Sequence, residues 1–246
     1  MNWQELKAPP IKEAIFDLRF SSESKLLVED IEQFCKNIEN DFTNTLPIFL
    51  FKIEGNASIN SSQISHNNVK IGFKLSREND SSIFQITNDG FTFSKLSPYS
   101  NWEDLKNNAF KYLNLLLKYF PNIQFQKIAL RYINEFNLDI KLGESINESL
   151  LIVPAYSDQL PRELESYFTQ LVIPDKNLGL KCIIHFAMQP LQNEKFKILL
   201  DIDVIKEQNY SAESIETLKN EFQNLRELKN KVFFNSLTIK VINNFK

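Results

Sequence analysis

Residues 11–20, IKEAIFDLRF, decide the fold class because apolar and charged residues alternate along them. In an extended chain successive side chains point to opposite sides, so this stretch separates into two faces. The apolar face holds Ala14, Phe16, Leu18 and Phe20, and the charged face holds Glu13, Asp17 and Arg19. The pattern predicts a strand with one buried and one polar face, and residues 125–138, FQKIALRYINEFNL, repeat it.

Amphipathic helices are predicted between and after these strands. Apolar residues recur every three or four positions in residues 27–42, 105–120 and 215–228. Asp89-Gly90 lies between two short β-type runs and is a hairpin signal. We therefore expect an α+β fold in which helices pack on one face of an antiparallel sheet.

The two halves of the chain share one predicted order of elements: a strand, a helix, antiparallel strands and a long helix. This order predicts two similar lobes, residues 1–122 and 123–246, as a duplicated unit, and it leaves open the alternative of one continuous domain.

Two stretches give weaker signals. The polar run 56–68 is expected to be a surface loop. The stretch after residue 138 is irregular, with Pro154, Pro161 and Pro174, and we expect a short helix near residues 161–168.

Composition excludes several classes of chemistry. The 246 residues include 28 Lys and Arg against 31 Asp and Glu, a net charge of −3, so nucleic acid is not an expected partner. Five scattered glycines cannot form a phosphate-binding loop or a dinucleotide fingerprint, and two Cys with two His cannot form an ordinary zinc site. We expect no cofactor.

The expected location is the cytoplasm. The first ten residues, MNWQELKAPP, lack the basic and apolar regions of a secretory signal. The densest apolar run, residues 112–120, is too short and too charged to span a bilayer, so no membrane association is expected.

The carboxylates are the one group of residues whose spacing suggests a catalytic or metal-binding site. Asp201 and Asp203 project on the same face of a strand, as do Arg131 and Glu135, and as do Asp17 and Arg19. If these strands are neighbours, all six residues share one sheet face. The mixture of acids and bases on that face favours ion pairing across strands there. The alternative is a catalytic site for a nucleotide or phosphoester, with Asp201 and Asp203 as metal ligands and Arg131 holding a phosphate.

Binding residues are expected at two kinds of position. Trp3, Tyr99 and Trp102 lie at the edges of segments, where aromatic side chains can anchor a partner. Arg19, Arg131 and Glu135 are the candidates on the charged sheet face. Charge is also uneven along the chain: residues 23–41 hold six acids and two bases, and residues 226–246 hold five bases and one acid. Either segment could dock a partner or a second copy of the chain.

Four stretches together carry a resemblance: PPIKEAIFDLRF at 9–20, FTFSKLSPYSNWEDL at 91–105, IALRYINEF at 128–136 and LKNKVFFNSLTIKVINNF at 228–245. As a set they resemble a sporadically distributed bacterial protein family of about this length, to which no activity is assigned. The resemblance implies no catalytic residue and no cofactor. Its patchy distribution is similar to that of mobile defence and toxin–antitoxin genes.

The leading hypothesis is therefore a non-enzymatic protein-binding module, such as an antitoxin, immunity or phage-defence accessory protein, whose partner is encoded by a neighbouring gene. The alternative that the chain forms a homodimer is left open. The second hypothesis is the divalent-metal-dependent enzyme using Arg131, Asp201 and Asp203. The third is nucleic-acid binding through the basic C-terminal segment.

Overall fold

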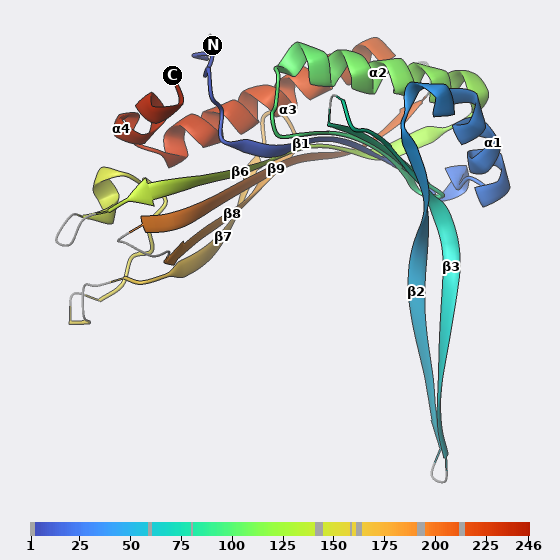
Figure 1. Cartoon of the computed structure of the whole chain (residues 1–246), viewed down its shortest axis with the longest axis horizontal. Helices are drawn as coiled ribbons and strands as arrows, with labels where there is room; N and C mark the ends of the chain where they lie inside the picture. Colours follow the sequence, from blue (N-terminus) through green and yellow to red (C-terminus); the bar gives the residue numbers. More distant parts are fainter. Residues whose placement is uncertain are drawn as a thin grey trace.

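The computed structural model describes residues 3–58, 61–79, 81–140, 145–157, 159–160, 164–190, 195–211 and 215–246, with the backbone alone at 52–58 and 61–67. One antiparallel sheet of nine strands runs through these residues, in the order β2-β3-β4-β5-β1-β6-β9-β8-β7 (Figure 1). Its strands are β1 (Ile11–Phe20), β2 (Asn44–Ser58), β3 (Ser61–Arg77), β4 (Ser82–Thr87), β5 (Gly90–Leu96), β6 (Gln124–Asp139), β7 (Tyr167–Asp175), β8 (Leu180–Pro190) and β9 (Lys195–Ser211).

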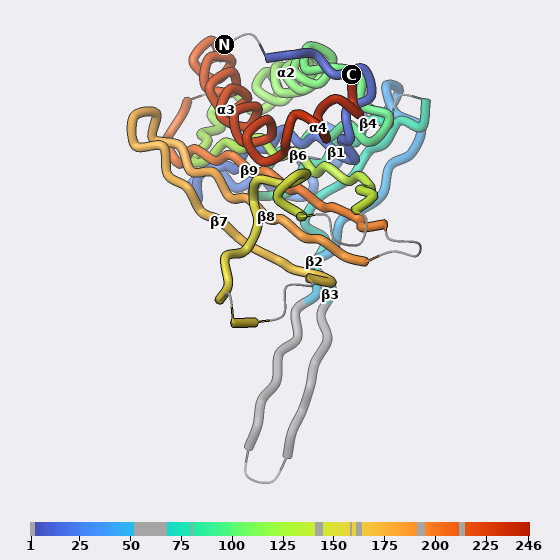
Figure 2. The backbone as a smooth tube through the Cα atoms, turned by 90° about the vertical axis from the view of Figure 1, so that its left-hand side faces the viewer, coloured from blue at the N-terminus to red at the C-terminus, as the bar shows by residue number. Residues whose placement is uncertain are grey.

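The helices lie on one side of this sheet, and Figure 2 shows the same from a second direction. They are α1 (Val28–Ile38), α2 (Trp102–Tyr119), α3 (Ile215–Ser236) and the short α4 (Ile239–Ile242). The core fills the space between these helices and the sheet. Phe16 of β1 lies at its centre, with its ring centroid 5.2 Å from that of Phe110 on α2 and 3.5 Å from that of Phe222 on α3.

The predicted fold class is confirmed at this level: a mixed fold dominated by an antiparallel sheet, with helices packed on one face. The two predicted segments, 1–122 and 123–246, meet at the pairing of β1 with β6, so that one sheet spans both. Alternation in β1 has the predicted result, since its even-numbered residues from Ala14 to Phe20 are buried under the helices. Within the described part of the chain, no helix is long and apolar enough to cross a membrane.

Two local predictions are wrong. The run 56–68 is not a surface loop, because its described residues belong to β2 and β3, which pair from Asn44↔Ser76 to Ser58↔Ser61. The expected helix near residues 161–168 is also wrong where the structure describes it, because residues 164–166 are not helical and Tyr167 begins β7; residues 161–163 lie outside the described residues. The three consecutive apolar residues of β7 and its Pro174 hid the strand pattern. Proline is tolerated in a strand at the edge of a sheet, and β7 is such a strand.

Candidate functional site

The six charged residues selected from the sequence lie on the helix-free face of the sheet. The register places Arg131 of β6 opposite Ile15 of β1 on one side and opposite Asp203 of β9 on the other. The face is occupied by ion pairs rather than by one convergent centre. These pairs form three groups, described in turn.

Arg131 and Asp201 form the strongest pair of the face. The Nε and Nη2 atoms of Arg131 donate to the two carboxylate oxygens of Asp201 at 2.8 and 2.6 Å. This bidentate geometry is the strong form of an ion pair, and the Asp201 side chain is only 7% exposed. On the neighbouring strand, His185 Nδ1 lies 3.4 Å from Asp201 Oδ2, and the ring of Phe168 stacks on His185. The Asp201 carboxylate therefore has basic groups on both sides.

Asp203 is the exception on this face. Burial raises the pKa of its carboxyl, while the charges of Lys127 and Arg131 oppose that rise. Its Oδ1 atom is buried and accepts no hydrogen bond. Among the described residues, no group of three or more His, Cys, Asp and Glu side chains could hold a metal ion.

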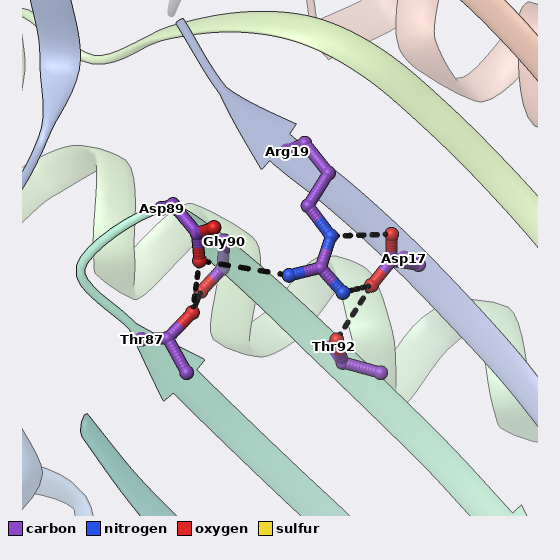
Figure 3. Close-up of polar contacts among 6 residues, drawn as sticks. All are labelled: Asp17, Arg19, Thr87, Asp89, Gly90 and Thr92. Carbon is purple, nitrogen blue, oxygen red and sulfur yellow. Dashed lines mark hydrogen bonds and ion pairs between the residues drawn. The ribbon is translucent and has the colours of Figure 1, made fainter. Parts of the chain in front are cut away.

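Asp17 and Arg19 form the second group, at the β4–β5 turn (Figure 3). Arg19 donates to both carboxylate oxygens of Asp17, at 3.1 and 2.8 Å, and its Nη1 lies 3.6 Å from Asp89. Thr92 also donates to Asp17, at 2.6 Å. A Cβ at Gly90 would lie 2.7 Å from Arg19 Nη1, so the glycine leaves room for the guanidinium.

Glu135 forms the third group with two lysines. Lys197 Nζ lies 2.8 Å from its carboxylate and Lys12 Nζ lies 3.5 Å from it. Their charges, with the Lys197 hydrogen bond first, lower the pKa of Glu135. Arg19, Arg131 and Glu135 thus share a face, as the pattern indicates, but each has an acidic or basic partner already.

The three aromatic candidates meet on the other side of the sheet. Trp3, Tyr99 and Trp102 line one cavity of about 520 Å³, which we call the α3 pocket. Trp3 stacks on Phe234 of α3 and donates from Nε1 to Glu227 at 2.7 Å. Trp102 is only 6% exposed, so it is a wall of the pocket and not a protruding anchor.

Two cations of α3, Arg226 and Lys229, line the same pocket. The Arg226 guanidinium lies 5.4 Å from the Trp102 ring centroid, and Lys229 Nζ lies 4.0 Å from that of Tyr132. Burial lowers the pKa of Lys229 to about 7, and the charge of Arg226 adds to this effect. The sequence indicated the basic character of residues 226–246, but not that these two side chains turn inward. Their spacing of three residues, one helical turn, is the signal that could have shown it.

A second hollow lies beside the edge strand β7, and we call it the β7 groove. It has a volume of about 620 Å³. Its apolar lining comes from β7 and β8, from α3 and from the segment before β7. These residues are Ile152, Leu171, Ile173, Pro174, Ile184, Leu228 and Val232.

The chain matches no protein-family model, no curated protein and no solved structure.

Proposed function

We propose that this chain is a non-enzymatic protein-binding module that receives an extended segment of a partner protein along β7. The observation that carries the proposal is that no strand of the described residues pairs with the outer edge of β7. β7 is the last strand in the order, and Phe168, Val172 and Ile173 on it are 66%, 53% and 47% exposed. Edge strands of soluble proteins usually carry charges that prevent pairing, whereas β7 has one charged residue, Asp175, at its end.

The geometry of β7 suits an added strand. Its free edge offers backbone N–H and C=O groups, and strand addition uses such groups for affinity. Alternate side chains of a strand point to opposite faces, and Leu171 and Ile173 point toward the β7 groove. The side chains of an added strand on that face would extend the same apolar wall. The partner segment is therefore expected to be apolar at alternate positions.

The lysines beside the β7 groove indicate which residues should flank the bound segment of the partner. Lys176 and Lys231 line the β7 groove, and no carboxylate of the described residues pairs with either. Asp175 is engaged nearby, because its Oδ1 accepts the backbone N–H groups of Asn177 and Leu178. An acidic flank on the partner segment would complement the two lysines.

The test is co-expression of the full chain with the products of its neighbouring genes, followed by size-exclusion chromatography and hydrogen exchange. Val172→Lys places a charge on the edge, and Ile239→Lys, at an exposed apolar residue of α4, is the matched control. We expect one neighbour to form a complex with the wild type and with the control but not with Val172→Lys. Amides of β7 should gain protection in that complex.

Two outcomes would overturn the proposal. In the first, a neighbour binds Val172→Lys as tightly as the wild type and protects amides elsewhere. In the second, no neighbour binds. If the chain then forms a dimer that Val172→Lys disrupts, a second copy occupies the edge instead.

The enzyme hypothesis has weaker support. A metal ion at Asp201 would have to displace Arg131, which donates to both carboxylate oxygens. If Asp201 and Asp203 nevertheless bind Mg²⁺ or Mn²⁺, either ion should raise the melting temperature of the wild type but not of Asp203→Asn. The nucleic-acid hypothesis also has weaker support, because two of the five bases of segment 226–246, Arg226 and Lys229, line the α3 pocket.

Two broader proposals rest on the pattern of the sequence. The four motif stretches support membership of the sporadically distributed bacterial family, and with it a cytoplasmic role as an antitoxin, immunity or phage-defence accessory protein. The mirrored strand order supports a duplicated unit: β5 and β4 follow outward from β1, as β9 and β8 follow outward from β6.

A further inference from the structure

The α3 pocket has the dimensions and the walls of a small-molecule site. Its volume of about 520 Å³ falls within the usual range for such sites, and several separate segments enclose it. Aromatic rings form much of the wall. Trp3 and Phe234 stack with nearly parallel planes, and Phe233 meets Phe234 edge to face. Such walls favour a flat apolar body in the ligand.

The pocket also holds two cations, Arg226 and Lys229, that form no ion pair with a described carboxylate. Neither Arg226 nor Lys229 lies within 4.0 Å of a carboxylate in the described residues. The acids close by have other partners: Glu227 accepts from Trp3 and Gln223, and Glu103 pairs with Lys106 at 2.6 Å. Glu5 also lines the pocket. Burying two like charges together is unfavourable, and an anion between them would offset that cost.

Polar groups in the pocket are arranged to donate. The hydroxyl oxygens of Tyr99 and Tyr132 lie 2.9 Å apart, and either can be the donor. Whichever donates, the other hydroxyl keeps its hydrogen for a further acceptor. Lys229 donates to Oδ1 of Asn230, a neutral partner, and part of the Lys229 side chain remains accessible. Its ammonium group therefore has hydrogens left for a ligand oxygen.

We propose that the α3 pocket binds a small aromatic carboxylate, with the carboxylate at Lys229 and Arg226 and the ring against the aromatic wall. Arg226 supplies a planar guanidinium that suits a carboxylate, and Lys229 supplies a point charge. The α3 pocket shares no lining residue with the β7 groove, so binding in the pocket is tested separately from the β7 edge.

The proposal predicts a pH dependence of affinity. Lys229 has a pKa of about 7 in the free protein, and a bound anion favours its charged form. Binding should therefore take up a proton at slightly alkaline pH, and affinity should fall as the pH rises above 7. Tyr99 and Tyr132, which also face the pocket, have raised pKa values and stay neutral over this range. The charges of Arg226 and Glu227 also act on Lys229, the first lowering its pKa and the second raising it.

The experiment is calorimetric titration of the full chain with 2-naphthoate, at about pH 6 and about pH 9. We expect one site per chain and an affinity that falls more than tenfold between these two pH values. The fall reaches about a hundredfold if the anion binds only the protonated form of Lys229. At about pH 8, titrations in buffers of different ionisation enthalpy should show close to one proton taken up. The neutral analogue 2-naphthalenemethanol should bind more weakly and without proton uptake. 2-Naphthyl phosphate tests whether the site prefers a phosphate.

Lys229→Met is the test variant, and Lys231→Met, two residues along α3 in the β7 groove, is its matched control. Lys229→Met should weaken 2-naphthoate binding at least tenfold at about pH 6, and Lys231→Met should leave it unchanged. Equal binding of naphthoate and the alcohol by the wild type would overturn the proposal, as would loss of binding in Lys231→Met alone. Proton uptake is measured on the wild type, so it tests the proposal even if the variant folds poorly. Tighter binding of the naphthyl phosphate would replace carboxylate with phosphate as the ligand class.

Discussion

The helix-free face and the α3 pocket both hold charged side chains, but those on the face form ion pairs and the two cations of the pocket do not. On the helix-free face Arg131 is bound by Asp201, and Glu135 is paired with two lysines. In the α3 pocket Arg226 and Lys229 face aromatic rings, and no carboxylate of the described chain pairs with them. Paired charges stabilise the sheet, whereas unpaired ones leave affinity for a ligand. The contrast favours the α3 pocket over the helix-free face as a candidate binding site.

The largest effect is expected from breaking the central pair of the helix-free face. Asp201→Asn keeps the size of the side chain but removes the negative charge that Arg131 binds at both oxygens. We expect a loss of about 3 kcal/mol in the free energy of unfolding, toward the low end for buried pairs because Arg131 is partly exposed. Urea unfolding near neutral pH measures it. Asp139→Asn, which removes an exposed carboxylate 3.8 Å from Lys195, should change stability by less than about 0.5 kcal/mol. Equal losses in the two variants would contradict the assigned role of the Arg131–Asp201 pair.

A substitution in the α3 pocket is expected to raise the free energy of unfolding instead of lowering it. The pKa of Lys229 falls from 10.5 to about 7 on folding, so the folded state binds its proton less tightly than the unfolded state. Burying the charged amine of Lys229 lowers the free energy of unfolding by the full amount below about pH 7. This loss of stability becomes smaller as the pH rises toward 10.5. A pKa that falls from 10.5 to about 7 corresponds to a cost of about 5 kcal/mol, and loss of the hydrogen bond to Asn230 and of the contact with the Tyr132 ring offsets part of the gain in the variant. Lys229→Met should therefore stabilise the protein by about 2 kcal/mol at acidic to neutral pH, and by less at alkaline pH.

Urea midpoints measured across this pH range test that prediction. The wild type should gain stability with rising pH relative to Lys229→Met, and Lys231→Met should follow the wild type. A Lys229→Met variant that is less stable than the wild type at every pH would show that the amine is compensated within the fold.

The sequence predicted the helix-free face better than the α3 pocket, and the reason is periodicity. A period of two assigns Asp17, Arg131 and Asp201 to one face once their strands are known, and it needs no knowledge of loops. The α3 pocket joins the N-terminal segment to α3, and Trp3 lies 224 residues from Glu227, to which it donates. Contacts of this range depend on how helices pack across the sheet, which local patterns do not encode.

The edge strand β7 was missed for a different reason. Leu171, Val172 and Ile173 are consecutive apolar residues, so no alternation is visible, and Pro174 argues against a central strand. An edge strand with apolar residues on both faces differs from the usual pattern. That difference is itself the feature on which the proposed function rests, since a conventional edge would carry charges. The prediction thus failed at the place where the chain departs from the rules for a protected sheet.

The smallest expected effect concerns Asp203, the one selected acid of the helix-free face that lacks a full set of partners. Its buried Oδ1 accepts no hydrogen bond, and burial raises its pKa above 3.8. A carboxyl whose pKa is raised by folding costs stability while it is ionised, and this cost disappears as the pH falls through the folded pKa. Asp203→Asn should therefore stabilise the protein near neutral pH, by less than the change expected for Asp201→Asn, with a gain that shrinks in acid.

The control is Glu207→Gln, which removes an exposed carboxylate of the same strand 3.8 Å from Lys181. Urea midpoints at neutral and acidic pH should show a gain for Asp203→Asn and almost none for Glu207→Gln. If Asp203→Asn instead destabilises the protein as Asp201→Asn does, then the carboxylate of Asp203 shares in holding Arg131. The charged face would in that case be one coupled network, and the contrast with the α3 pocket would be sharper still.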